Sequence, residues 1–133
     1  MKSFMEIALS EAKLASLEDE VPIGAIIANR DGKIFARTRN KNKKLNDPTA
    51  HAEILAIRTA CKKIKSDRLV GYSIYVTLQP CEMCFHAILN AKISRLYYGA
   101  SDFENESLQN KYKIISQNKK YNIDIFSGIN EKK

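Results

Sequence analysis

The chain has 133 residues, of which 44% are hydrophobic and 28% are charged. This suits one soluble domain with a core of its own. It has no apolar run long enough to cross a bilayer, and Glu6 and Glu11 interrupt the N-terminal segment where a signal peptide would need an apolar stretch. A net charge of +7 favours an anionic partner, with nucleic acid the first candidate, although a merely soluble basic surface would carry the same charge.

The three cysteines point to a reducing compartment. An odd number argues against a disulfide framework, and reduced thiols are available to bind metal. We find no internal repeat, low-complexity tract or linker. We therefore expect a single cytoplasmic domain that spans residues 1–133.

The first half of the chain predicts a helix followed by a hairpin. Residues 3–18 have apolar side chains at helical spacing with Lys and Glu between them. Residues 23–28 form a short apolar run, residues 29–32 read Asn-Arg-Asp-Gly, which is typical of a hairpin turn, and residues 33–39 are the partner strand. Residues 40–46 predict a polar, basic loop.

A second helix is predicted to begin at Asp47 and Pro48. Asp can cap exposed amides, and Pro is tolerated in the first turn of a helix. We expect this helix to continue to about Lys63. Its predicted buried side chains are Ile54, Leu55, Ile57 and Cys61.

The second half alternates strands and helices. Residues 73–78 and 95–99 are rich in β-branched or aromatic side chains and predict strands, whereas residues 81–90 predict a capped helix. A helix around residues 108–115 and an edge strand at 123–126 complete the order. Alternation of this kind predicts an α/β fold of three layers, in which helices flank a mixed five-stranded sheet.

The sequence His51-Ala52-Glu53, followed by Pro80-Cys81-Glu82-Met83-Cys84, carries the chemistry. One imidazole and two thiolates are three ligands for Zn²⁺, one short of a closed tetrahedral site, and a catalytic zinc needs that open position for water. Glu53 lies beside the His ligand, where it can move protons. The pattern is similar to the signature of zinc-dependent nucleobase deaminases.

The spacing of these residues places the metal at two helix N-termini. Residues 51 and 53 face one site only if that site lies over the first turn of their helix, and Cys81 and Cys84 share a face in the first turn of the next helix. The partial positive charge at a helix N-terminus favours thiolates. The strand at residues 73–78 leads directly into Cys81, so the site is expected beyond the carboxyl end of a strand.

This arrangement predicts hydrolytic deamination. Glu53 is expected to take a proton from the water, pass one to a ring nitrogen and then protonate the leaving amine, while backbone N–H groups near Cys81 steady the developing oxyanion. The alternative is a closed, non-catalytic zinc site with His86 as its fourth ligand. The two-residue spacing from Cys84 argues against it. For His86 we expect a surface or packing role, and for Cys61 a small buried hydrophobe.

Three longer strings carry a family resemblance: Glu20-Val21-Pro22-Ile23-Gly24-Ala25, then residues 47–54 (DPTAHAEI), then residues 75–84 (YVTLQPCEMC). They resemble the bacterial tRNA-specific adenosine deaminases of the cytidine deaminase superfamily. The resemblance implies conversion of adenosine to inosine at the wobble position of a tRNA anticodon, by a homodimer with one Zn²⁺ per subunit.

The resemblance also implies site residues. His51, Cys81 and Cys84 match the zinc ligands and Glu53 the proton shuttle. The positions expected to contact the target nucleoside are Asn40, Ala52, Pro22 and Gly24; a plain loop role for Asn40 is the alternative. The candidates for holding the RNA backbone are Arg39, Lys41, Lys43 and Lys44, with Arg37 beside them and a second cluster at Lys62, Lys63, Lys65 and Arg68. For Tyr72, Tyr75, Tyr97 and Tyr98 we expect packing rather than base stacking.

The chain departs from the family pattern in three places. Gln79 replaces the usual Glu before Pro-Cys, residues 103–106 replace a glycine-containing segment, and the family's C-terminal helix is not expected here. Two other functions stay open: a deaminase of a free base or nucleoside, of the guanine or cytosine type, and a non-catalytic, zinc-stabilised RNA-binding module.

Overall fold

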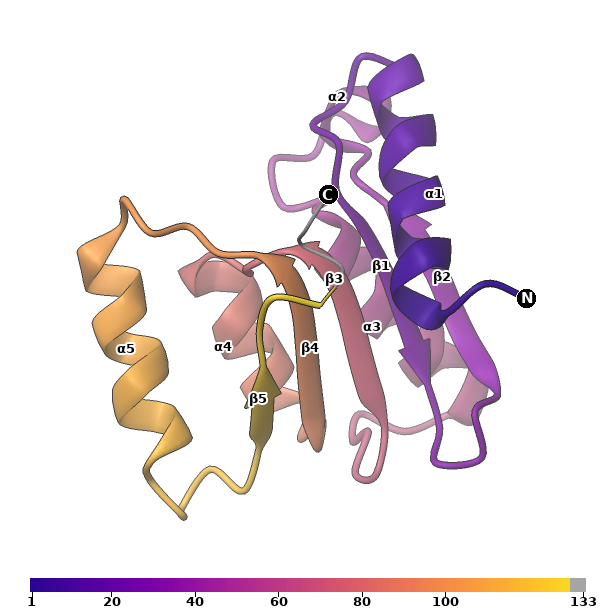
Figure 1. Cartoon of the computed structure of the whole chain (residues 1–133). Coiled ribbons are helices and arrows are strands. Elements are labelled where there is room, and N and C mark those ends of the chain that lie inside the picture. Colours follow the sequence, from indigo (N-terminus) through magenta and orange to yellow (C-terminus); the bar gives the residue numbers. More distant parts are fainter. Residues whose placement is uncertain (130–133) are drawn as a thin grey trace.

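The computed structural model describes residues 1–129 as a five-stranded sheet in the order β2-β1-β3-β4-β5. Figure 1 shows α1 in front of this sheet and α3 and α4 behind it. The predicted fold class, a mixed sheet between helical layers, is therefore confirmed. No helix among these 129 residues has the length and apolarity needed to cross a membrane.

The N-terminal elements follow the predicted order. Helix α1 (Phe4–Leu17) begins with a capping box, in which the Ser3 hydroxyl accepts from the Glu6 amide and the Glu6 carboxylate accepts from the Ser3 amide. Strands β1 (Gly24–Ala28) and β2 (Ile34–Arg39) pair antiparallel across the predicted turn.

The remaining strands make the sheet mixed. Strand β3 (Ser73–Leu78) pairs antiparallel with β1 and parallel with β4 (Arg95–Ala100), which pairs parallel with β5 (Asp124–Phe126). The two crossovers are α4 (Glu82–Asn90) and α5 (Glu106–Ser116). The parallel pairing brings the carboxyl ends of β3 and β4 to the same edge of the sheet.

The start of the second predicted helix was wrong. Helix α3 spans Ala52–Ile64 with His51 as its N-cap, so Asp47 does not cap it. The Asp47 carboxylate instead accepts from the amide and hydroxyl of Thr49, at 2.9 and 2.7 Å. This local bond stabilises a turn, which competes with helix initiation. The predicted loop at residues 40–46 also contains one helical turn, α2 (Asn42–Leu45).

The predicted burial of α3 was also wrong. Its fully buried apolar residues are Ala52, Ala56 and Ala60, whereas Ile54, Leu55, Ile57 and Cys61 are only half-buried. Alanines at every fourth position allow α3 to lie close against β1 and β2. Ile57 and Cys61 pack against the margin of the core, so Cys61 is a half-buried packing residue.

The other face of the sheet packs against α1. Gly24 is required there, because a Cβ at this position would lie 2.0 Å from the Ala8 carbonyl oxygen. Farther along the sheet, Tyr75 and Tyr97 stack with ring centroids 4.5 Å apart, flanked by Phe4 and Phe126. These tyrosines therefore pack the fold, as predicted.

Candidate active site

Two helix N-termini meet at one point, as the sequence predicted. His51 is the N-cap of α3, and Cys81 is the N-cap of α4, with Cys84 in the first turn of α4. Cys81 follows the carboxyl end of β3 after only two residues. The sheet edge and the two helix starts therefore bring together side chains that are 30 and 33 residues apart in sequence.

The three side chains are spaced to hold a metal ion. The His51 Nδ1 atom lies 3.8 Å from the Cys81 Sγ and 3.4 Å from the Cys84 Sγ, and all three donor atoms lie within 4.8 Å of one another. Tetrahedral zinc with ordinary Zn–S and Zn–N bonds would separate S and N by about 3.6 Å. The soft donor set and its spacing therefore fit such an ion.

The two thiols are strongly coupled. A hydrogen bond from Cys84 lowers the pKa of Cys81 to about 5, and the same contact raises the pKa of Cys84. The pair thus shares one proton between two sulfurs. A metal ion that binds both as thiolates would displace that proton.

Glu53 lies in the first turn of α3 with only 3% of its surface exposed. Burial raises its pKa to about 7, which is close to the value that suits a group that both takes and gives protons at neutral pH. Its Oε1 atom is buried and has no hydrogen-bond partner within the described part of the chain. An orphaned carboxylate oxygen is costly, and it indicates a site built for a ligand or water.

Asn40 is tied to the same helix start. It is 3% exposed, and its Oδ1 accepts from the Ala52 amide at 2.7 Å. The Ala52 carbonyl in turn accepts from the Thr38 hydroxyl. Asn40 and Ala52 therefore lie beside His51 and Glu53, where a ligand of the site would be.

Two other predicted contact residues flank Ile23, whose carbonyl oxygen accepts from the Asn40 amide at 3.2 Å. Pro22 is exposed, and Gly24 is buried beneath α1. The geometry gives Gly24 a packing role. A contact between either residue and a nucleoside stays a prediction.

The alternative of a closed site with His86 finds no support in residues 1–129. His86 is exposed on α4, and the group of side chains there that could hold a metal ion consists of His51, Cys81 and Cys84. The predicted surface role of His86 fits this placement.

The basic residues near Asn40 divide into two groups. Arg37 and Arg39 pair with the buried Glu11 at 2.6 and 2.9 Å, and Arg39 also pairs with Glu18. These ion pairs join β2 to α1 and neutralise much of the charge of the two arginines. Lys43 and Lys44 are exposed, as is part of Lys41, and their side chains are the better candidates for an anionic ligand.

The loop with these lysines is fixed by an acidic residue that the sequence did not reveal. Glu20 is 7% exposed, and its two carboxylate oxygens accept from the backbone amides of Lys43 and Lys44 at 3.1 and 2.9 Å. This carboxylate therefore binds the first turn of α2 and leaves both lysine side chains toward solvent.

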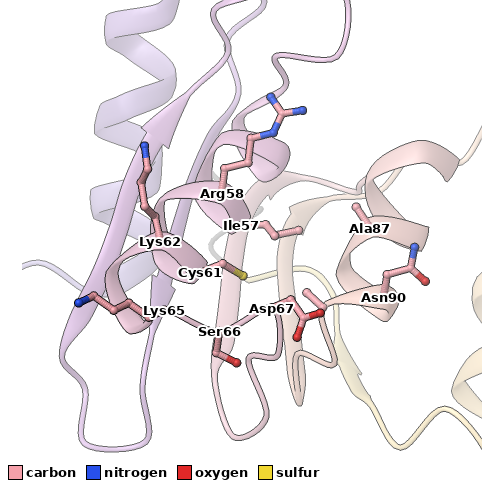
Figure 2. A pocket seen from close by; sticks show the side chains of 10 residues that line it. Ile57, Arg58, Cys61, Lys62, Lys65, Ser66, Asp67, Ala87 and Asn90 are labelled. Carbon is pink, nitrogen blue, oxygen red and sulfur yellow. The ribbon is translucent and has the colours of Figure 1, made fainter.

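A broad hollow lies away from His51, Cys81 and Cys84. Figure 2 shows it between α3 and α4, with the Ile57 and Cys61 side chains pointing from α3 toward α4. It measures about 740 Å³, and Arg58, Lys62 and Lys65 line it too. It contains none of the predicted catalytic or metal-ligating residues.

Known proteins share the fold of this chain and much of its sequence. The chain matches the family of MafB19-like deaminases over residues 1–133. It is 47% identical to a tRNA-specific adenosine deaminase of Agrobacterium fabrum, over 96% of this chain and 84% of that protein. The chain belongs to the tRNA-specific adenosine deaminase family.

Solved structures agree with this membership. A structure from studies of A-to-I editing by tRNA:A34 deaminases superimposes with a TM-score of 0.86 at 47% identity, over 96% of this chain and 93% of that one. The guanine deaminase of Bacillus subtilis superimposes at 0.74, with 33% identity over 85% of this chain and 76% of that one. The tRNA-specific adenosine deaminase family thus shares its fold with an enzyme named for a free base.

Proposed function

We propose that this protein converts adenosine to inosine at the wobble position of a tRNA anticodon, with release of ammonia. The observation that carries this proposal is the unpartnered, buried Oε1 of Glu53 beside the three metal donors. A purely structural metal site would have no use for a buried, unpartnered carboxylate beside it. The family membership supplies the substrate class.

We propose that His51, Cys81 and Cys84 hold one Zn²⁺, as their donor types and spacing fit. When bound, the ion would lower the pKa of a coordinated water toward neutrality. Glu53 would accept one proton from the attacking water and deliver it to a ring nitrogen of adenine. It would then carry the second proton of the water, from the new hydroxyl on the ring carbon, to the amine, which leaves as ammonia. Burial raises the pKa of Glu53, which favours a carboxyl group that can both take and give a proton.

The substrate must reach a recessed site. A base in a duplex would first have to unstack, whereas a base in an anticodon loop is already single-stranded, so less energy is needed to flip it. Asn40 would hydrogen-bond the flipped nucleoside through its amide nitrogen, because its oxygen is bonded to Ala52. Lys41, Lys43 and Lys44 would hold the phosphates next to it.

We propose further that the protein acts as a homodimer whose two subunits line the RNA cleft, as the family resemblance implies. The reaction would take place in the cytoplasm, where thiolate ligands stay reduced.

A second candidate is a deaminase of a free purine base, favoured by the similarity to the guanine deaminase. The test runs both reactions side by side. Zinc-loaded protein is incubated with an anticodon stem-loop that carries adenosine at the wobble position, and separately with guanine, cytosine and their nucleosides.

We expect inosine in the stem-loop and no ammonia from the small substrates. A stem-loop with guanosine at the wobble position is the matched control. Ammonia from guanine, without inosine in the RNA, would show that the substrate is a free base and not tRNA. Turnover with neither kind of substrate would favour the RNA-binding module.

A further inference from the structure

The four residues Gln79-Pro80-Cys81-Glu82 join the end of β3 to the start of α4 and carry one metal donor. Three of these four residues are contacted by side chains from a single helix, α5, which lies about 30 residues later in the chain. None of these α5 side chains is a metal donor.

The first contact is made by Tyr112. Its hydroxyl donates to the Pro80 carbonyl oxygen at 2.8 Å, and the residue is 5% exposed. The Tyr112 ring stacks on Phe85, with ring centroids 3.8 Å apart. One side chain thus holds the residue before Cys81 and the residue after Cys84.

The second contact is a pair of amides. The Gln109 Nε2 donates to the Gln79 Oε1 at 2.6 Å and to the Asp102 carbonyl at 2.8 Å, and the Asp102 amide also donates to Gln79 at 2.9 Å. Gln79 is 4% exposed. The unusual Gln before Pro-Cys therefore has a matching partner on α5, and together they fix the loop that follows β4.

The third contact is an exposed ion pair between Lys111 and Glu82, at 2.6 Å. Exposed pairs contribute little to stability, so the two buried contacts are expected to dominate.

Burial also raises the pKa of Tyr112, which keeps its hydroxyl protonated and able to donate.

We infer that α5 positions the metal-binding turn of this enzyme, with Tyr112 as the principal positioning residue and the Gln79–Gln109 pair as its support. The hydroxyl of Tyr112 limits the movement of the peptide that ends at Cys81, so that Sγ stays in reach of the ion. This inference rests on the proposed zinc site. It assigns no catalytic step to Tyr112.

The test measures zinc directly. Zinc-loaded wild type and Tyr112→Phe are mixed with a chromophoric chelator in excess, and the rate of zinc release is followed without RNA. Phe keeps the ring stack on Phe85 and removes only the hydroxyl. Loss of a hydrogen bond that orients a ligand typically costs about tenfold or more in metal affinity, so we expect release about tenfold faster.

Two α5 variants are the controls. Lys113→Ala changes an exposed residue and should release zinc at the wild-type rate. Ile115→Val weakens the packing of α5 and leaves the hydrogen bonds to residues 79–82 in place. It should lower the unfolding temperature and release zinc at close to the wild-type rate. Gln109→Leu should resemble Tyr112→Phe in a weaker form.

Substitution with Co²⁺ gives a readout that general destabilisation does not change. We expect the thiolate-to-cobalt absorption of Tyr112→Phe to shift relative to wild type, because one sulfur is held less firmly. Wild-type release and an unchanged cobalt spectrum in Tyr112→Phe would overturn the inference and leave the proposed function intact. A wild type that binds no zinc would overturn both.

Discussion

The Asn40 side-chain oxygen accepts a hydrogen bond from the Ala52 backbone amide at 2.7 Å. This bond fastens the end of β2 to the first turn of α3, between His51 and Glu53. Asn40 thus satisfies one of the free amides at the helix N-terminus. Its amide nitrogen, at the other end of the same group, is the part proposed to meet the nucleoside.

Substitutions of Asn40 should separate these two roles. Asn40→Asp keeps the acceptor for Ala52 and removes the donor, so we expect near wild-type unfolding free energy with deamination lost. Asn40→Ala removes both and should also cost about 1 kcal/mol of unfolding free energy, which is typical of a lost helix cap. Urea unfolding and inosine formation are measured on both variants. Full activity of Asn40→Asp would exclude the proposed hydrogen bond from Asn40 to the nucleoside.

Gly24 is predicted to act through packing. A Cβ there would lie 2.0 Å from the Ala8 carbonyl, so Gly24→Ala must push α1 away from the sheet at a cost of about 3 kcal/mol or more. Urea unfolding measures this loss. If Gly24→Ala keeps its stability and only raises KM for RNA, the residue serves the substrate instead.

The pairing of Glu11 with two arginines predicts a pH effect. Burial opposes ionisation of Glu11, but hydrogen bonds from Arg37 and Arg39 outweigh it and hold its pKa below the ordinary value of 4.5. A lowered folded-state pKa gives stability that is present above pH 4.5 and is lost as the pH falls through the folded value. Glu11→Gln should therefore be less stable than wild type at neutral pH, by about 2 kcal/mol.

The difference should shrink as the pH falls below 4.5. The difference is measured by chemical unfolding of both proteins at about five pH values between pH 3 and pH 7. A constant difference over this range would mean that the Glu11 charge contributes nothing.

The exposed lysines beside the site predict salt-dependent binding of RNA. Each phosphate contact releases counterions, so Lys43→Ala with Lys44→Ala should lower the slope of log K against log salt by about 2. Zinc content should not change. Lys119→Ala with Lys120→Ala is the control, because both residues are exposed and follow the C-terminal end of α5. Equal slopes for wild type and the first pair would exclude this loop from the RNA contact.

Sequence patterns predicted that His51, Cys81 and Cys84 come together, because each belongs to a short motif that begins a helix. His51 and Glu53 are neighbours, as are Cys81 and Cys84, and only the meeting of the two motifs depends on the fold. The strands were likewise predicted close to their observed bounds. The first two lie on either side of a recognisable turn, and β3 and β4 are rich in β-branched or aromatic side chains.

What could not be predicted depends on contacts between distant residues. Tyr112 and Pro80 are 32 residues apart, and Gln109 and Gln79 are 30 apart, so no local pattern connects them. The start of α3 was misplaced because Asp47 and Pro48 read equally well as a helix start and as a turn, and the bond to Thr49 decides for the turn. The buried alanines of α3 were missed because larger side chains dominate a hydrophobic pattern.

The role of Glu53 is the centre of this account, and one substitution tests it. Glu53→Gln keeps the shape of the side chain and removes its ability to carry a proton. Zinc per chain and inosine formed in the anticodon stem-loop are measured on the same preparation, with Cys84→Ser as the control that should lose the metal. We predict that Glu53→Gln retains the zinc content of wild type and loses about 10²–10⁴-fold in turnover; a variant that keeps both its zinc and its turnover would contradict the account.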